Sequence, residues 1–431
     1  MDRHPPARFF DRIGLGRPEL RAWALYDWAN SAYITIVVTA VFPIWFQNLA
    51  SGHLTHAETT SRYALATTCA LLAVAVLAPL LGAVADLYPV KKRLLGVFMS
   101  LGALCTLGLA LTGTSHWGWS LVLFALGNVG AFLSFVFYDA LLPHVAKSGE
   151  VDRVSTAGYA LGYLGGGLLL AVNLLWIVNP ERFGLSGPDD AVRLAFVSVA
   201  VWWVVFSIPL LRKVPEPPPS PDVIPLPVRL KQTFRELLAH REATLMLAAF
   251  LIYNDGIVTI IRMATVYGSE IGLPANGMII AILLVQFAGI PFAFLFGLLA
   301  NRIGTRQALL VGLAVYVLIC VLGYRMDNVA EFYLLAFLVA TVQGGCQALS
   351  RSLFASMIPK QKSAEFFSLF AVCEKAASVA GPALFGLVTA WSGSGRSAVL
   401  VMVLFFVVGA AVLSRVDVAA GRAQVRDPAQ G

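Results

Sequence analysis

The chain has 431 residues, of which 58% are hydrophobic and 13% are charged, and its mean hydropathy is +0.77. A soluble protein carries about 25% charged residues, so this composition excludes a soluble globular protein and indicates a polytopic membrane protein. The formal net charge of +7 therefore has to be interpreted from the positions of the basic residues rather than from their sum.

Twelve segments are long and apolar enough to cross a bilayer, which takes about 20 residues in a helix. They are 23–48, 64–86, 94–113, 119–142, 154–178, 193–211, 243–267, 276–299, 308–324, 331–349, 367–391 and 397–414. The polar segment 1–22 holds five arginines and does not have the apolar core of a signal peptide. The predicted fold class is an all-α polytopic membrane protein with twelve transmembrane helices.

The distribution of Lys and Arg predicts the orientation in the membrane. With both termini inside, the inner segments hold 24 of these residues and the outer segments hold five. Because cytoplasmic loops carry the excess of Lys and Arg, we expect both termini, including the tail 415–431, to be cytoplasmic.

A proline-rich linker at 212–242 separates six spans from six. Its first part, "PEPPPSPDVIPLP", favours an extended spacer, because proline cannot continue a helix. The following "VRLKQTFRELLAHREA" places Leu230, Phe234, Leu237 and Leu238 on one helical face with basic residues around it. We expect an interfacial amphipathic helix on the cytoplasmic leaflet; a plain solvated linker helix is the alternative.

The two halves, 23–211 and 243–414, repeat each other at an offset of 215 residues. Gly82-Ala-Val-Ala-Asp86 ends span two, and Gly297-Leu-Leu-Ala-Asn301 ends span eight. Basic residues follow both copies. Duplicated units of this kind are typical of secondary transporters. We therefore expect two pseudo-symmetric six-helix bundles.

Polar side chains are unevenly distributed among the spans. Spans three, six, nine and twelve carry no charged, amide or histidine side chain within 94–113, 194–211, 308–324 and 397–414. Such side chains are costly in lipid and therefore face a cavity or a partner. The spans that do carry them are predicted to surround a hydrated path, and the candidate residues for substrate or coupling are Asp27, Asn30, Asn128, Asp255, Arg262, Gln343, Gln347 and Lys375.

These candidates suggest a site with both signs of charge. Asp255 lies near the middle of span seven, and Arg262 is two turns further along the same face. Asp27 or Asp255 is expected to hold a proton or a substrate amine, with Arg262 or Lys375 as the countercharge. Glu374 points about 100° away from Lys375 and is expected to pair elsewhere. The alternative is that the charges only pair with each other and hold the halves together.

Other kinds of site have little support in the sequence. The five cysteines lie in apolar segments without metal-ligand spacing, and the six histidines lie in loops or at span ends. There is no nucleotide-binding loop and no catalytic triad pattern. We expect no enzyme activity, no cofactor, no metal and no nucleic-acid partner.

The chain resembles the major facilitator superfamily throughout. The period of three in polar spans matches that fold, as does the loop motif Gly-x-x-x-Asp followed by basic residues, although each copy departs from it. The resemblance implies a gate at the cytoplasmic face built from Gly82, Asp86, Lys91, Arg93, Gly297, Asn301, Arg302, Gly304 and Arg306. Asp86 would accept hydrogen bonds at the N-terminus of span eleven, where the helix dipole favours an anion.

A narrower resemblance rests on "LYDWANSAY", "YNDGIVTI" and "GGCQALSRSLFASMIPKQKSAEFF". These stretches are similar to the vacuole effluxer-like family, which holds fungal autophagy-related vacuolar amino-acid effluxers and bacterial permeases. The resemblance implies a monomeric permease of the bacterial inner membrane. Together with the intramembrane charges, it leads us to expect a secondary transporter that moves a small polar or zwitterionic solute, such as an amino acid, by alternating access with proton coupling. A lipid or lysolipid flippase, a drug or metabolite exporter and a membrane receptor remain as alternatives.

Overall fold

The computed structural model describes residues 9–113, 116–147, 149–221 and 224–425. Parts of the expected N-terminal segment and tail, 1–8 and 426–431, lie outside these ranges. The helices are α1 (Phe9–Arg12), α2 (Pro18–Ala32), the π-helix Tyr33–Val41, α3 (Phe42–Ala50), α4 (His56–Leu87), α5 (Lys91–Leu109), α6 (Trp117–Val145), α7 (Val151–Val178), α8 (Pro188–Lys213), α9 (Leu226–Ala239), α10 (Arg241–Glu270), α11 (Ala275–Ile303), α12 (Thr305–Tyr324), α13 (Val329–Ala355), α14 (Ser363–Ser392), α15 (Gly395–Val401), α16 (Val403–Leu413) and α17 (Val418–Gln424).

Twelve helical segments among the described residues are long and apolar enough to span a membrane, as the sequence predicts. The first combines α2, the π-helix and α3, and the last combines α15 and α16. Short 3-10 turns, Pro180–Phe183 and Lys360–Lys362, lie in two of the connections. The all-α polytopic fold class is confirmed.

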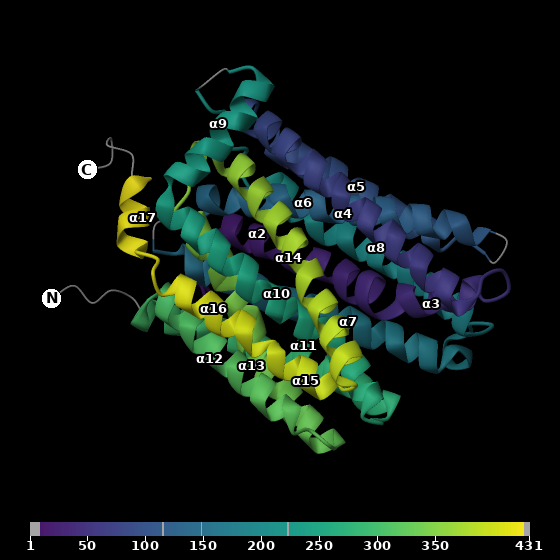
Figure 1. The fold of residues 1–431 in the computed structure, drawn as a ribbon. Helices are drawn as coiled ribbons and strands as arrows, with labels where there is room; N and C mark the ends of the chain where they lie inside the picture. The colour runs from purple at the N-terminus through teal and green to yellow at the C-terminus, as the bar shows by residue number, and fades with distance from the viewer. Residues whose placement is uncertain (1–8, 114–115, 148, 222–223, 426–431) are drawn as a thin grey trace.

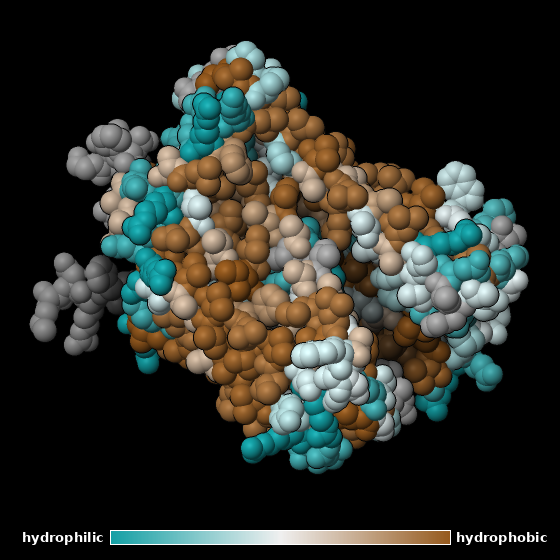
Figure 2. Space-filling view, viewed as in Figure 1, coloured by the Kyte–Doolittle hydropathy of each residue, from teal (hydrophilic) through white to brown (hydrophobic). Residues whose placement is uncertain are grey.

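The two halves diverge from one end of the molecule. In Figure 1, α2 to α8 run toward the right, α10 to α16 run toward the bottom, and the two sets meet on the side where N and C are marked. We call this side the terminal end and the opposite side the distal end. Figure 2 shows a broad hydrophobic belt between more hydrophilic surfaces at the two ends, as a bilayer-spanning protein requires.

Local sequence signals fix the ends of several helices. Thr55 and Glu58 form a reciprocal capping box at the start of α4, which satisfies amides that the first turn leaves unpaired. Gly304 has a φ of 93° and separates α11 from α12, a conformation that glycine adopts without steric cost. These tight ends keep the polar loops short.

Span ten extends beyond its predicted boundary. The sequence places its end at 349 and Arg351 in a loop, but α13 continues to Ala355. The helix can continue because its polar side chains have buried partners. Tyr253 Oη lies 2.5 Å from Ser350 Oγ, and Ser352 Oγ donates to Asp152 at 2.5 Å. This extension places Arg351 inside the bundle.

Candidate functional site

A cluster centred on Arg351 joins the two halves near the terminal end. The Nη2 atom of Arg351 lies 3.1 Å from Asp27 Oδ2 of α2, and its Nη1 lies 3.0 Å from Asp139 Oδ1 of α6. Its Nε donates to Ser155 Oγ of α7 at 2.9 Å. The Arg351 side chain is only 5% exposed. One guanidinium of the C-terminal half thus binds three helices of the N-terminal half.

Aromatic rings complete this cluster. The Arg351 guanidinium lies 4.9 Å from the Trp23 ring and 4.6 Å from the Tyr159 ring. Tyr138 donates from Oη to Asp27 Oδ2 at 2.8 Å and stacks on Trp23 with centroids 4.4 Å apart. A charge that is removed from water is tolerated when it is paired and hydrogen-bonded. Trp23, Asp27 and Tyr138 supply that environment.

Glycines of α7 allow Asp27 to occupy the interior. A Cβ atom at Gly158 would lie 2.5 Å from Asp27 Oδ2, and one at Gly162 would lie 2.6 Å from Ser31 Oγ. The polar face of α2 therefore packs directly on the backbone of α7. Asp27, the carboxylate near the start of an apolar span, thus forms an ion pair with Arg351.

A small polar cavity lies next to this cluster. Its volume is about 30 Å³, which leaves room for a water molecule or two. It is lined by Asp139, Tyr159, Phe250, Asn254, Gln347, Arg351, Phe370 and Glu374, from helices of both halves. Asn254 is 2% exposed, and its Nδ2 atom has no hydrogen-bond partner among the described residues. An amide donor thus remains unused beside a cavity that carries both signs of charge.

Span seven contributes a different residue from the one expected. Asp255, the sequence candidate, accepts a hydrogen bond at 2.9 Å from the backbone amide of Gly381 in α14. Pro382 follows Gly381 inside α14, and an internal proline disturbs the local helical hydrogen bonds. Asp255 therefore bonds to the backbone of α14 next to its internal proline, and its neighbour Asn254 lines the cavity.

In span eleven, too, the neighbour of the expected residue lines the cavity. The sequence favours Lys375 for the cavity, but Glu374 lines it. Lys375 Nζ lies 2.9 Å from Glu374 Oε1 and 4.3 Å from the centre of the Phe132 ring of α6. The expectation that Glu374 pairs elsewhere is wrong, because the adjacent side chains curl toward each other.

The remaining candidates occupy separate places. Gln347 lines the cavity, and Gln343 interacts with Tyr163 of α7. Asn128 donates to Phe124 O of its own helix at 2.9 Å, so a solute is not needed to account for this polar residue within the span. Asn30 is buried at 5% exposure.

Arg262 lies two turns beyond Asp255 on α10, and the two side chains interact electrostatically. Its side chain is exposed, and its electrostatic partners are Tyr63 of α4, Asp255 and Glu374. Tyr63 belongs to the other half of the molecule. Arg262 therefore lies toward the space between the halves.

The first contact that closes the terminal end is built around Asp86. Its two carboxylate oxygens accept hydrogen bonds from the amides of Ala364 at 3.2 Å and Glu365 at 2.8 Å, in the first turn of α14. Lys91 Nζ lies 2.7 Å from Asp86 Oδ1, and both side chains are at most 1% exposed. Gly82 permits the approach, because a Cβ there would lie 2.7 Å from Ala364 O. The sequence anticipates this hydrogen bonding at the N-terminus of span eleven.

The second contact has the opposite arrangement. The carboxylate is Asp152, in the first turn of α7, and it accepts hydrogen bonds from Thr305 Oγ1 at 2.6 Å and Ser352 Oγ at 2.5 Å. Gly297 of α11 packs on the Thr156 side chain of α7. The two motif glycines thus both lie where the halves touch.

Most other residues of the second motif copy do not cross between the halves. Asn301 and Arg302 are exposed. Arg306 donates to Val416 O at 2.6 Å, within the C-terminal half, and Gly304 forms the turn before α12. In the first copy, Arg93 is exposed.

Sequence reasoning missed Arg351, Asp139 and Asp152. The apolar pattern of span ten ends at 349 and predicts a loop at Arg351, and Asp139 lies three residues before the expected end of span four. A usable signal existed for Asp139, because it follows Tyr138 within an otherwise apolar helix. For Asp152 and Ser352 no signal was available, since both lie at helix ends where polar residues are ordinary.

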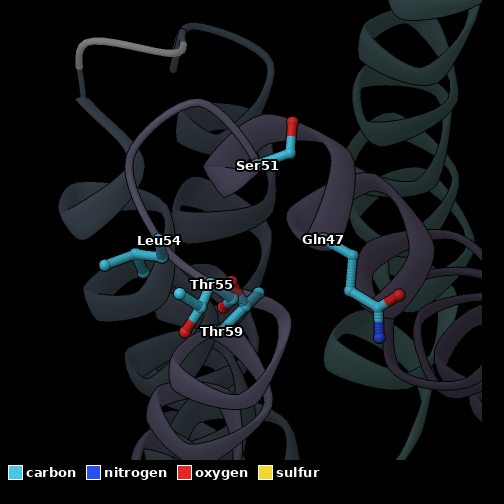
Figure 3. Close-up of a pocket in the computed structure, with 5 residues that line it drawn as sticks. All are labelled: Gln47, Ser51, Leu54, Thr55 and Thr59. Carbon is cyan, nitrogen blue, oxygen red and sulfur yellow. Dashed lines mark hydrogen bonds between the residues drawn. The ribbon is translucent and has the colours of Figure 1, made fainter.

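A larger cavity lies elsewhere, between α3 and the start of α4. Its volume is about 330 Å³, and its lining residues are Gln47, Ser51, Leu54, Thr55 and Thr59 (Figure 3). All five belong to one half and none is charged. Thr55 is already occupied in capping α4. The cavity between the halves is the better candidate for a site that changes when the halves move.

Comparison with known proteins identifies the family. The model of the family "Vacuole effluxer Atg22 like" matches residues 55–152 and 144–426. The chain belongs to this family. It is 35% identical over 400 residues to an uncharacterized MFS-type transporter, YxiO of Bacillus subtilis, covering 91% of this chain and 93% of that protein. The chain is therefore an MFS-type transporter rather than an enzyme.

Fungal family members are more distant. Autophagy-related protein 22 of Yarrowia lipolytica is 28% identical over 312 residues, covering 63% of this chain and 51% of that protein. The aligned region thus represents about half the length of this fungal relative.

Solved structures confirm the Atg22-like chain's fold. The MFS transporter FucP in its outward conformation has a TM-score of 0.72 at 13% identity, covering 94% of this chain and 99% of that one. The proton:xylose symporter XylE has a TM-score of 0.69 at 15% identity, covering 97% and 99%. At these identities the likeness shows the fold alone.

Proposed function

We propose that the chain carries a small zwitterionic solute, of the size and charge of an amino acid, by alternating access with proton coupling. The observation that carries this proposal is the cavity between the halves. It offers one guanidinium, two carboxylates and an amide donor without a partner among the described residues, from Arg351, Asp139, Glu374 and Asn254. A zwitterion needs both signs of charge together, whereas an acyl chain would gain nothing from this lining.

The cavity must widen before such a solute can bind. At about 30 Å³ it has room for water but not for an amino acid. Its walls are held in place by Arg351–Asp139 and Glu374–Lys375, at 3.0 and 2.9 Å. A carboxylate and an amine of the solute are proposed to replace these internal partners. A proton on Asp139 or Glu374 would release the carboxylate from its cation.

Orientation and setting complete the proposal. The excess of Lys and Arg in the segments at the terminal end supports cytoplasmic termini. The likeness to a Bacillus subtilis transporter supports a bacterial cytoplasmic membrane. One chain supplies both walls of the cavity, which is consistent with a functional monomer.

Uptake of radiolabelled amino acids into proteoliposomes under an imposed pH gradient tests this function. Asn254→Leu is expected to lower uptake at least tenfold, because it removes a donor beside the cavity and fills the space. Asn128→Leu is the matched control, since that amide bonds within its own helix. Equal uptake by the two variants would remove the cavity from the proposal.

Proton coupling is tested by comparing uptake by the variants Glu374→Gln and Asp255→Asn. Uptake by Glu374→Gln is expected to continue without responding to the pH gradient, while Asp255→Asn retains the response. The opposite result would assign coupling to Asp255, and a response retained by both variants would assign it to Asp139. Absence of amino-acid uptake in the parent protein, together with movement of a labelled lysolipid, would replace the solute carrier with a lipid carrier.

A further inference from the structure

The linker helix α9 is fixed to the terminal end at several points. Before it, Glu216 accepts hydrogen bonds from the Lys92 amide at 3.1 and 3.2 Å, and the Ser220 amide donates to Asp86 O at 2.6 Å. After it, Thr244 Oγ1 donates to Leu237 O at 2.5 Å. The position of α9 is therefore set by the bundle.

The inner face of α9 has polar partners in the protein. Arg229 Nη2 lies 2.6 Å from Glu365 Oε1, and both side chains are at most 2% exposed. Thr233 also donates to Glu365, and Lys362 Nζ lies 2.8 Å from Glu236. This face is therefore held at the start of α14.

The outer face of α9 combines apolar and basic side chains. Val228, Phe234 and Leu238 are 55%, 54% and 55% exposed. Lys231 and Arg235 are exposed between them. The spacing of three to four residues places all five on one side of the helix. The sequence expectation that Leu237 shares the lipid face with Phe234 is wrong, because Leu237 is buried at 4% exposure.

We propose that this outer face binds the surface of a bilayer that contains anionic lipids. Basic residues with intervening apolar side chains match negatively charged headgroups above an acyl layer. A second copy of the chain would bring the same positive charges face to face. In Figure 2, hydrophobic and hydrophilic surface lie together where Figure 1 places α9, near the hydrophobic belt of the spans. The charge pattern and the closeness to that belt both select lipid as the occupant.

Lipid binding at α9 has a consequence for the closed terminal end. The helix that would lie on the bilayer also holds Glu365, whose amide donates to Asp86. Anionic lipid is therefore expected to stabilise this contact between the halves. This consequence rests on the proposed alternating access, whereas the lipid surface itself does not.

Hydrogen exchange of the full-length protein in lipid nanodiscs tests the surface. Amides of 228–238 are expected to exchange about thirtyfold more slowly when phosphatidylglycerol is added to phosphatidylcholine, because two basic residues at about 1 kcal/mol each contribute about 2 kcal/mol. The double variant Lys231→Glu with Arg235→Glu should lose this difference. The matched control, Arg182→Glu with Arg325→Glu, makes the same change in net charge on other exposed loops and should keep it. Equal exchange in both lipids, or a difference that survives at α9 in the first variant, would overturn the proposal.

Flux in the same two lipid compositions tests the consequence. A change in the uptake rate that disappears in Lys231→Glu with Arg235→Glu supports coupling between lipid and gate. If exchange depends on phosphatidylglycerol but uptake does not, the lipid surface stands and the coupling is wrong. Loss of all uptake in the parent protein would instead count against the proposed function.

Discussion

The two contacts that close the terminal end use the same motif in opposite ways. On the α4–α14 side, Asp86 is completely buried, binds two backbone amides and carries a buried lysine as its countercharge. On the α7–α11 side, Asp152 binds two hydroxyl groups, and the motif position Asn301 is exposed. One contact is an ionic lock on a helix end, and the other is a neutral-donor contact. Sequence pseudo-symmetry therefore does not produce the same chemistry at the two contacts.

The largest effect is expected at Asp86. Asp86→Ala leaves the Lys91 ammonium buried without its partner, which costs about 3–5 kcal/mol. We expect a large fall in the apparent melting temperature. Faster maleimide labelling is also expected at a cysteine placed at Ser368, beside Gly82, in a chain without Cys69 and Cys373. Arg93→Ala, at an exposed motif position, is the control. Unchanged labelling at Ser368 would contradict the ionic lock.

Asp152→Ala should have a smaller and differently placed effect. It removes hydrogen bonds from Thr305 and Ser352, but no buried cation among the described residues loses a partner, so we expect a cost of about 1.5–3 kcal/mol. Labelling should increase at a cysteine placed at Ala348, which lies where α13 meets α7, more than at Ser368. Equal labelling at the two positions would mean that the two contacts open together.

The two motif glycines should differ as well. A methyl group at Gly82 meets the backbone carbonyl of Ala364, which cannot rotate away, so Gly82→Ala should cost about 1–2 kcal/mol. At Gly297 the obstacle is the hydroxyl of Thr156, a side chain that can turn. Gly297→Ala should therefore lower the melting temperature less, and a double variant with Thr156→Ala should recover it.

The smallest effect is expected from Asn301→Asp, which restores the motif's carboxylate. Because position 301 is exposed, the added charge has no buried partner, and we expect a change of less than about 0.5 kcal/mol. A marked stabilisation would show that Asn301 reaches the α7 N-terminus in another state of the transporter.

The fold was predictable because its signal is spread over long apolar runs and a repeat of 215 residues. The Asp86 contact was also predictable, since a carboxylate at a helix end beside a helix N-terminus follows from local chemistry. The lining of the cavity was not predictable, because a step of one residue around a helix changes which side chain faces it. Asn254 and Glu374 line the cavity, while their neighbours Asp255 and Lys375 bind Gly381 and Glu374. Arg351 was missed because its burial depends on Asp27 and Asp139, more than 200 residues away.

The π-helix Tyr33–Val41 is a segment of the first span where the helical winding can change. Its amides bond five residues back rather than four, and π-turns in α-helices frequently mark functional positions. Asp27 anchors the inner part of this span to Arg351, and Thr35 Oγ1 accepts from Gln286 of α11 at 3.0 Å. Rewinding of these nine residues into α-turns would twist the distal part of the span about its own axis and carry Thr35 away from Gln286. The distal part of the span could then rotate about the helix axis while its inner end stays bound to Arg351.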